Sequence, residues 1–188
     1  MIKKQIIFFI SCFILFGFTA QNGIQNVPLL DLKGNTFKLN QLHKYKATAI
    51  FFMSPECPLC QNYTLTINQL IKKYNGKAID FIGVVPTKDL PVADILKYKR
   101  SYKSNLNLVR DSENKLVKKL GATITPEVFL VDSKGVTIYS GRIDNWAYEL
   151  GKKRTVITAH ELVDAIESVL NNKPVKIKKT KAVGCFIE

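Results

Sequence analysis

Two largely apolar runs separated by an amphipathic stripe constrain the fold of this chain more than any other feature. The runs span residues 47–53 and 78–85, and apolar side chains recur at helical spacing through residues 60–74. A run of strand length that is apolar at almost every position predicts a strand covered on both faces. A strand, a helix and a second strand in this order build parallel sheets with helices packed against them. The sequence therefore predicts an α/β domain with a buried central sheet.

Shorter elements extend this unit on both sides. We expect a hairpin of residues 27–32 and 36–39 around Gly34, with its turn at the glycine. Asp111 is expected to cap a short helix. The remaining predicted elements are helices at 89–102, 112–120 and 158–170, a strand at 106–109, and an antiparallel edge hairpin of 128–131 and 136–140. Together they define one domain over residues 27–172, followed by a basic tail, residues 173–188, that carries Cys185.

The first twenty residues are typical of a secretory signal peptide. Lys3 and Lys4 form a basic head, a mostly apolar run covers residues 6–18, and Ala20 ends the segment. The run is shorter than the roughly 20 residues that a permanent transmembrane helix needs. We therefore expect cleavage and export to a periplasmic or other extracytoplasmic space. Phe18 is an imperfect residue for the cleavage site, which leaves an uncleaved membrane anchor as the alternative.

The charge of the chain is strongly basic. There are 28 Lys and Arg against 15 Asp and Glu, a formal net charge of +13. Nucleic-acid binding is one use of such a charge, but the lysines are scattered and an exported protein seldom meets nucleic acid. We expect a solvated basic surface, no nucleic-acid partner, and membrane contact only through the signal or anchor segment.

The segment Cys57-Pro58-Leu59-Cys60 lies where the first buried strand passes into the predicted helix. A cysteine at a helix amino terminus meets unpaired N–H groups and the helix dipole, which favour the reactive thiolate. Two intervening residues allow the Cys60 sulfur to reach Cys57 and resolve a mixed disulfide formed there. Pro58 suits the first helical turn, where its missing N–H costs nothing.

Two interpretations without redox chemistry compete with this one. A structural disulfide gains most by closing a long loop, whereas this pair would close a very short one. A zinc site would need two more ligands, and the candidates His43, His160 and Cys185 lack metal-motif spacing. We favour redox chemistry with no metal and no organic cofactor.

Cys185 leaves the mature chain with an odd number of cysteines, because Cys12 lies inside the apolar run of the leader. Export places these thiols where disulfides persist, so at least one of the three is unpaired, transiently paired or paired with another molecule. A third redox thiol and a free thiol packed by Phe186 and Ile187 are both open for Cys185.

Four segments resemble the thioredoxin superfamily, specifically its redoxin branch of exported thioredoxin-like and peroxiredoxin-like proteins. They are FFMSPECPLC at residues 51–60, LGATITPEVFLVD at 120–132, YSGRID at 139–144 and TKAVGC at 180–185. The resemblance implies a thioredoxin-like fold with a mixed sheet, and a cis peptide bond at Pro126 that faces the cysteine pair. It also implies that the backbone of Thr125 pairs with a substrate strand. By sequence alone Pro126 could equally be an ordinary trans turn residue.

Some residues depart from the patterns of this superfamily. Glu56 stands where thioredoxins carry Trp, and residues 47–53 hold no acid for proton transfer. A negative neighbour such as Glu56 also opposes thiolate formation. Ser54 suits the peroxiredoxin pattern, but Ile50 occupies its proline position. Copper-delivery relatives have three residues between their cysteines and a histidine in a later loop, whereas two residues intervene here and we expect His160 in the terminal helix.

The segment after the edge hairpin is less informative. Arg142 and Asp144 fit an ion pair of the edge strand and a substrate-facing role equally well. Trp146, Tyr148 and Arg154 fall in a segment that we expect to be a loop near the active face.

These observations predict dithiol–disulfide exchange on protein substrates. Cys57 attacks, Cys60 resolves, and Thr125 with Pro126 aligns the substrate chain. The expected partners are protein thiols or disulfides and a redox partner protein. Thiol peroxidase, copper-binding assembly factor and interaction module with a static disulfide are the alternatives.

Overall fold

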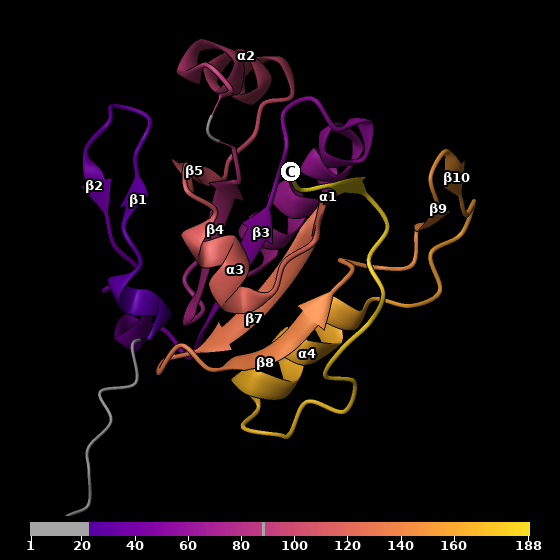
Figure 1. Cartoon of the computed structure of the whole chain (residues 1–188). Coiled ribbons are helices and arrows are strands. Elements are labelled where there is room, and N and C mark those ends of the chain that lie inside the picture. The colour runs from indigo at the N-terminus through magenta and orange to yellow at the C-terminus, as the bar shows by residue number, and fades with distance from the viewer. Residues whose placement is uncertain (1–22, 88) are drawn as a thin grey trace, which may run out of the picture.

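A seven-stranded mixed sheet forms the centre of the computed structural model, which describes residues 23–87 and 89–188 (Figure 1). The predicted signal peptide, residues 1–20, lies outside the described residues. The strand order is β2-β1-β5-β4-β3-β7-β8. The strands are β1 (Leu29–Leu30), β2 (Thr36–Phe37), β3 (Ala47–Phe52), β4 (Ile79–Val85), β5 (Asn107–Arg110), β7 (Glu127–Asp132) and β8 (Thr137–Gly141).

The pairing directions confirm the predicted mixed sheet. Strand β3 runs parallel to β4, and β4 runs parallel to β5. Strand β7 is antiparallel to both β3 and β8, so the predicted edge hairpin is present. The expected hairpin around Gly34 is present as β1 and β2. All six residues of β3 are buried because helices cover both faces of the sheet, as a continuous apolar run predicts.

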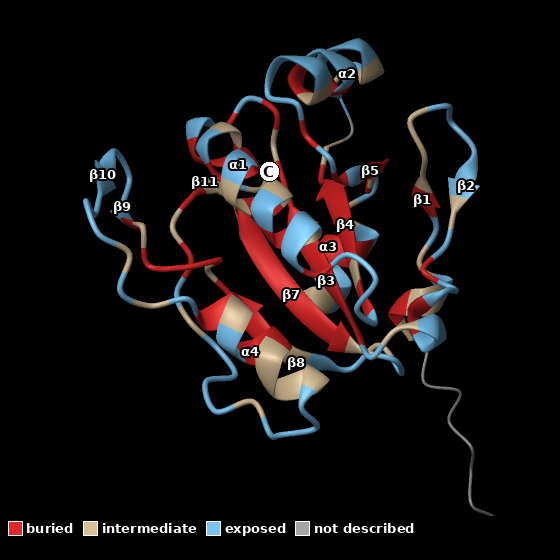
Figure 2. Ribbon diagram, turned by 180° about the vertical axis from the view of Figure 1, so that it is seen from behind, coloured by how far each residue is buried: buried red, intermediate tan, exposed pale blue. Residues whose placement is uncertain are grey.

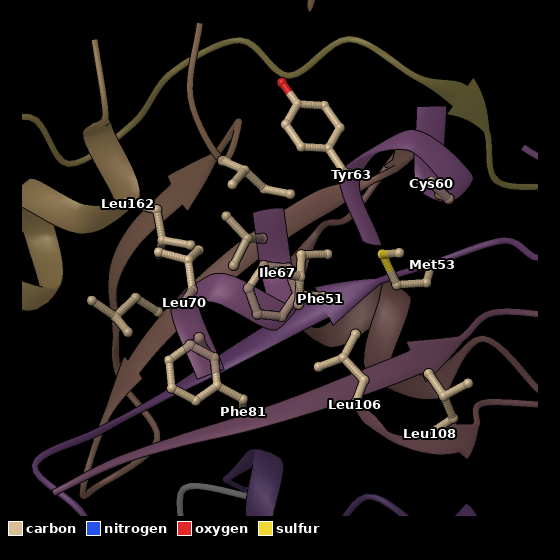
Figure 3. Close-up of a cluster of buried hydrophobic side chains, with 14 of the residues drawn as sticks. Phe51, Met53, Cys60, Tyr63, Ile67, Leu70, Phe81, Leu106, Leu108 and Leu162 are labelled. Carbon is tan, nitrogen blue, oxygen red and sulfur yellow. The ribbon is translucent and has the colours of Figure 1, made fainter. Parts of the chain in front are cut away.

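Four helices flank the sheet: α1 (Pro58–Lys73), α2 (Val92–Ser101), α3 (Lys115–Leu120) and α4 (Glu161–Leu170). Helices α1 and α4 contribute to one buried cluster with Phe51 of β3, and α3 contributes to a second cluster with Phe52. Alternation along β3 places these two rings on opposite faces. Figure 3 shows Ile67 and Leu70 of α1 beside Phe51 in the first cluster, and Figure 2 shows the buried sheet between the helices.

The predicted cap of α3 is confirmed. The carboxylate of Asp111 accepts hydrogen bonds from the backbone N–H groups of Lys115, Leu116 and Val117 at 2.8–2.9 Å. The helix starts at Lys115 rather than at residue 112, because the intervening residues form a turn in which Asn114 has φ +53°. Helix α2 starts later than predicted, after Pro91, whose ring cannot extend the helix toward the amino terminus.

Two segments carry more structure than the sequence predicts. The expected loop around Tyr148 contains a small hairpin of β9 (Ala147–Glu149) and β10 (Lys152–Lys153), so the prediction of an irregular loop is wrong there. The tail also contains a strand, β11 (Cys185–Phe186), which pairs with β6 (Ile124–Thr125). Within residues 23–87 and 89–188, no helix has the length and apolar character needed to cross a membrane.

Candidate active site

The two cysteines of the pair lie at the start of α1, shortly after the end of β3. Cys57 is the residue before the first helical turn, and Pro58 occupies that turn as predicted. The Cys57 thiol donates to the carbonyl oxygen of Thr125 over 3.3 Å. Cys60 is fully buried, and its sulfur accepts a hydrogen bond from the Ser54 N–H over 3.3 Å. The two residues do not form a disulfide in this structure.

The peptide bond between Thr125 and Pro126 is cis, as the resemblance implies. Thr125 belongs to β6, directly before β7, and its side chain and backbone are buried against the cysteine pair. The structure therefore brings together Cys57, Cys60 and the Thr125–Pro126 pair from segments almost 70 residues apart. Cys185 joins them, because it lies opposite Thr125 in the pairing of β11 with β6.

The thiols of the pair differ strongly in acidity. A hydrogen bond from the Cys60 thiol, helped by one from Cys185, lowers the pKa of Cys57 from 9.0 to about 5. Burial raises the pKa of Cys60 well above its usual value, and the neighbouring Cys57 charge adds to this. Cys57 therefore loses its proton far more readily than Cys60, which is the division of roles that a nucleophile and a resolving thiol need.

A polar contact that the sequence does not reveal supports α1 one turn after Cys60. The Tyr63 hydroxyl donates to Asp144 Oδ1 over 2.8 Å, and the N–H of Trp146 donates to the same oxygen over 2.9 Å. The rings of Tyr63 and Trp146 meet edge to face with centroids 5.2 Å apart. Asp144 thus joins the segment after β8 to the helix that carries the cysteines, and Trp146 packs against that helix through Tyr63.

The other residues of this segment have different roles. Arg142 forms an ion pair with Glu161, a buried residue at the start of α4. This decides the open question for Arg142 in favour of an ion pair, although its partner is in α4 rather than at the sheet edge. Arg154 lies over the ring of Tyr148, 5.0 Å from its centroid, on the β9–β10 hairpin.

A cavity of about 250 Å³ opens beside Cys57. Its wall is formed by residues around Cys57 and by the C-terminal residues 185–188. The lining residues are Ser54, Glu56, Cys57, Pro86, Thr87, Leu90, Thr125, Cys185, Phe186, Ile187 and Glu188. Neither His43 nor His160 belongs to this wall, and His160 directly precedes α4 instead of lying within it. No group of three or more His, Cys, Asp or Glu side chains is arranged to hold a metal ion in residues 23–87 and 89–188.

Comparison with known proteins gives one family match and several similar folds. The model of the family described as Redoxin matches residues 19–149. A "Thioredoxin-like protein" of Haemophilus influenzae is 30% identical over 112 residues, which is 60% of this chain and 64% of that protein's length. The match therefore spans less than two thirds of this relative.

Two solved structures illustrate the shared fold. A hypothetical protein from Sinorhizobium meliloti superimposes with a TM-score of 0.76 at 22% identity, over 88% of this chain and 91% of that one. A secreted Mycobacterium tuberculosis disulfide oxidoreductase homologous to E. coli DsbE gives a TM-score of 0.52 at 16% identity, over 77% of this chain and 94% of that one. At these identities the likeness concerns the fold.

Proposed function

The chain belongs to the redoxin family of thioredoxin-like proteins, and we propose that it is an exported thiol–disulfide oxidoreductase that exchanges disulfides with protein substrates. The observation that carries this proposal is the placement of Cys57 directly before α1 and 3.3 Å from the Thr125 carbonyl oxygen, with Cys60 buried in the first turn of the helix. In this setting the pKa of Cys57 is lowered to about 5 and that of Cys60 is raised. The name of the secreted M. tuberculosis protein, a disulfide oxidoreductase, is consistent with this chemistry.

The exchange proceeds in two displacements. The Cys57 thiolate attacks one sulfur of a substrate disulfide, forming a mixed disulfide and releasing the other substrate sulfur as a thiolate. Cys60 then loses its proton and attacks the Cys57 sulfur, which releases the second substrate thiolate and leaves a Cys57–Cys60 disulfide. The substrate gains two electrons and the cysteine pair loses two. A partner protein with two thiols restores the reduced pair by the reverse steps.

The backbone beside Pro126 is proposed to align the substrate. Thr125 already accepts a hydrogen bond from the Cys57 thiol through its carbonyl oxygen. A substrate chain paired with β6 would bring its own sulfur next to Cys57. Export, which rests on residues 1–20, would place the reaction where substrate disulfides persist.

Insulin reduction with dithiothreitol tests the proposal. We expect Cys57→Ser to abolish the acceleration, because it removes the attacking sulfur. Mixed with insulin in the absence of dithiothreitol, a chain with both Cys60→Ser and Cys185→Ser should accumulate a covalent Cys57–substrate adduct, since both resolving thiols are gone. His43→Ser is the control, because His43 lies outside the cavity wall, and it should keep the full rate.

Two other outcomes would support one of the alternative functions. Oxidation of Cys57 by peroxide that outpaces insulin reduction by orders of magnitude would indicate a thiol peroxidase. One tightly bound copper ion that is lost in Cys57→Ser would indicate metal delivery. Insulin reduction that survives Cys57→Ser would overturn the proposed exchange.

A further inference from the structure

The C-terminal segment, residues 173–188, ends in a strand that pairs with Thr125, the residue whose backbone the proposed function assigns to the substrate. Strand β11 (Cys185–Phe186) pairs antiparallel with β6, and Cys185 lies opposite Thr125. One residue further on, the Ile187 N–H donates to the Thr123 carbonyl oxygen over 3.0 Å. Figure 1 shows the end of the chain beside the start of α1, far from α4, the helix that precedes the C-terminal segment. The chain thus places its own C-terminus where a substrate strand would pair.

Glycine at two positions makes this close approach feasible. A Cβ on Gly184 would collide with the carbonyl group of Thr125. A Cβ on Gly141 would collide with Thr180, and Gly141 also has φ +132°, a conformation that other residues rarely adopt. Side chains at either position would push the C-terminal segment away from the domain. The absence of these side chains indicates a specific seat for the segment.

Further contacts hold the segment along its length. The N–H of Ser140 donates to the Lys178 carbonyl over 3.0 Å, and the Thr180 N–H donates back to the Ser140 carbonyl over 2.9 Å. At the end of the chain, the side-chain amide of Asn114 donates to the Glu188 carbonyl over 2.7 Å. In contrast, the Phe186 side chain is 82% exposed. Backbone hydrogen bonds therefore run along the segment, as they would for a bound peptide, and the partly buried Ile187 adds an apolar contact with the cluster that contains Phe52.

Cys185 is the residue of this segment that reaches the reactive sulfur. Cys185 lies opposite Thr125, whose carbonyl oxygen contacts the Cys57 sulfur over 3.3 Å, and burial raises the pKa of Cys185 to about 11. Both residues line the same cavity. Cys57 therefore has two thiol neighbours, Cys60 on the buried side and the partly exposed Cys185 on the side of the substrate backbone.

We propose that residues 182–188 are an intramolecular substrate of the cysteine pair, and that Cys185 exchanges with the Cys57–Cys60 disulfide to form a Cys57–Cys185 disulfide. In this step the Cys185 thiolate attacks the Cys57 sulfur, a new S–S bond forms, and Cys60 leaves as a thiolate that takes up a proton. One disulfide replaces another, so no external oxidant is consumed. The inference rests on the proposed function, because that function supplies the oxidised pair.

The exchange has a consequence for substrate access. In the reduced chain only non-covalent contacts hold the segment, so a protein substrate can displace it from Thr125. In the Cys57–Cys185 form the segment is covalently held there, which excludes protein substrates. A small thiol or a partner protein must first attack the more exposed Cys185 sulfur to release it.

Oxidised glutathione provides a direct test with the Cys60→Ser chain. Its disulfide transfers one glutathione to Cys57, and Cys185 then displaces that glutathione as a thiolate. We expect most molecules to carry a Cys57–Cys185 disulfide in peptide mapping by mass spectrometry. The control chain with both Cys60→Ser and Cys185→Ser should instead retain glutathione on Cys57.

The outcomes separate the two proposals. A retained adduct in both chains, with Cys185 free in the first, would overturn the intramolecular substrate and leave the proposed exchange intact. No adduct on Cys57 in the control chain would contradict the proposed function itself.

Gly184→Val tests whether the close approach of residue 184 to the Thr125 carbonyl group positions Cys185, and it leaves every cysteine in place. In the unaltered cysteine background, this side chain should reduce the yield of the Cys57–Cys185 disulfide and raise the rate of insulin reduction several-fold. Gly151→Ala is the control, because Gly151 has φ +76° but no neighbouring atoms within 4 Å at the position of the new Cβ. Equal disulfide yields in the two variants would show that the approach of Gly184 to Thr125 does not position Cys185 for the exchange.

Discussion

The Tyr63 hydroxyl donates a hydrogen bond to Asp144 Oδ1 across 81 residues of sequence. Tyr63 projects from α1 one turn after Cys60, and Asp144 follows the edge strand β8. Both side chains are buried, with 4% and 3% of their surface exposed. The contact therefore fixes the cysteine-bearing helix to the segment that follows the edge strand β8.

Asp144→Ala should destabilise the domain by about 1–3 kcal/mol, because it leaves the Tyr63 hydroxyl and the Trp146 N–H buried without an acceptor. The free energy of unfolding in urea measures the loss. The control is Glu149→Ala, which removes an exposed ion pair with Lys152 and should change stability by less than about 0.5 kcal/mol. Equal effects of the two substitutions would show that the buried contact contributes little.

Cys57 should titrate far below an ordinary thiol. We expect the rate of alkylation at Cys57 to follow an apparent pKa of about 5 in the reduced chain. In Cys60→Ser, a pH profile shifted toward higher pH is expected, because the largest contribution to the low pKa is the hydrogen bond from the Cys60 thiol. An unchanged profile would assign the acidity to the helix amino terminus instead.

The same titration makes stability depend on pH. The folded pKa of Cys57 lies below the unfolded value of 9.0, so its contribution is fully present above pH 9 and is lost as the pH falls through about 5. Under reducing conditions, the difference in unfolding free energy between the unaltered chain and Cys57→Ser should therefore increase from pH 5 to pH 8. A difference that stays constant over this range would contradict the low pKa.

Asp111→Ala should cost about 1–2 kcal/mol, because three N–H groups at the start of α3 lose their acceptor. Urea unfolding measures this loss as well. Glu113→Ala is the matched control, since Glu113 pairs only with the exposed Lys115 in the same turn. A larger effect for Glu113→Ala would contradict the capping role.

The sequence predicts the parts of the structure that depend on local pattern. The apolar run that ends at Phe52 becomes a strand buried on both faces, and the CxxC segment lies at a helix start. Asp111 is recognisable as a cap because a short polar side chain there precedes a helical stripe. The resemblance additionally implies the cis bond at Pro126, which the residues alone do not distinguish from a trans bond.

The missed features depend on contacts between distant segments. Tyr63 and Asp144 are ordinary residues of a helix and a loop until the fold brings them together. Strand β11 has two residues, too few for a periodic pattern, and its register with Thr125 is set by the seat at Gly184. The β9–β10 hairpin is equally short and has exposed lysines on one strand.

The C-terminal segment that follows α4 also affects the tendency of this protein to self-associate. Strand β8 ends the sheet, and an uncovered end strand offers free N–H and C=O groups on which a second chain can add. Here Lys178 and Thr180 take up both backbone groups of Ser140. Cleavage or displacement of residues 178–180 would expose the free backbone groups of β8 to another chain, so the tail that carries Cys185 also protects this edge of the sheet from aggregation.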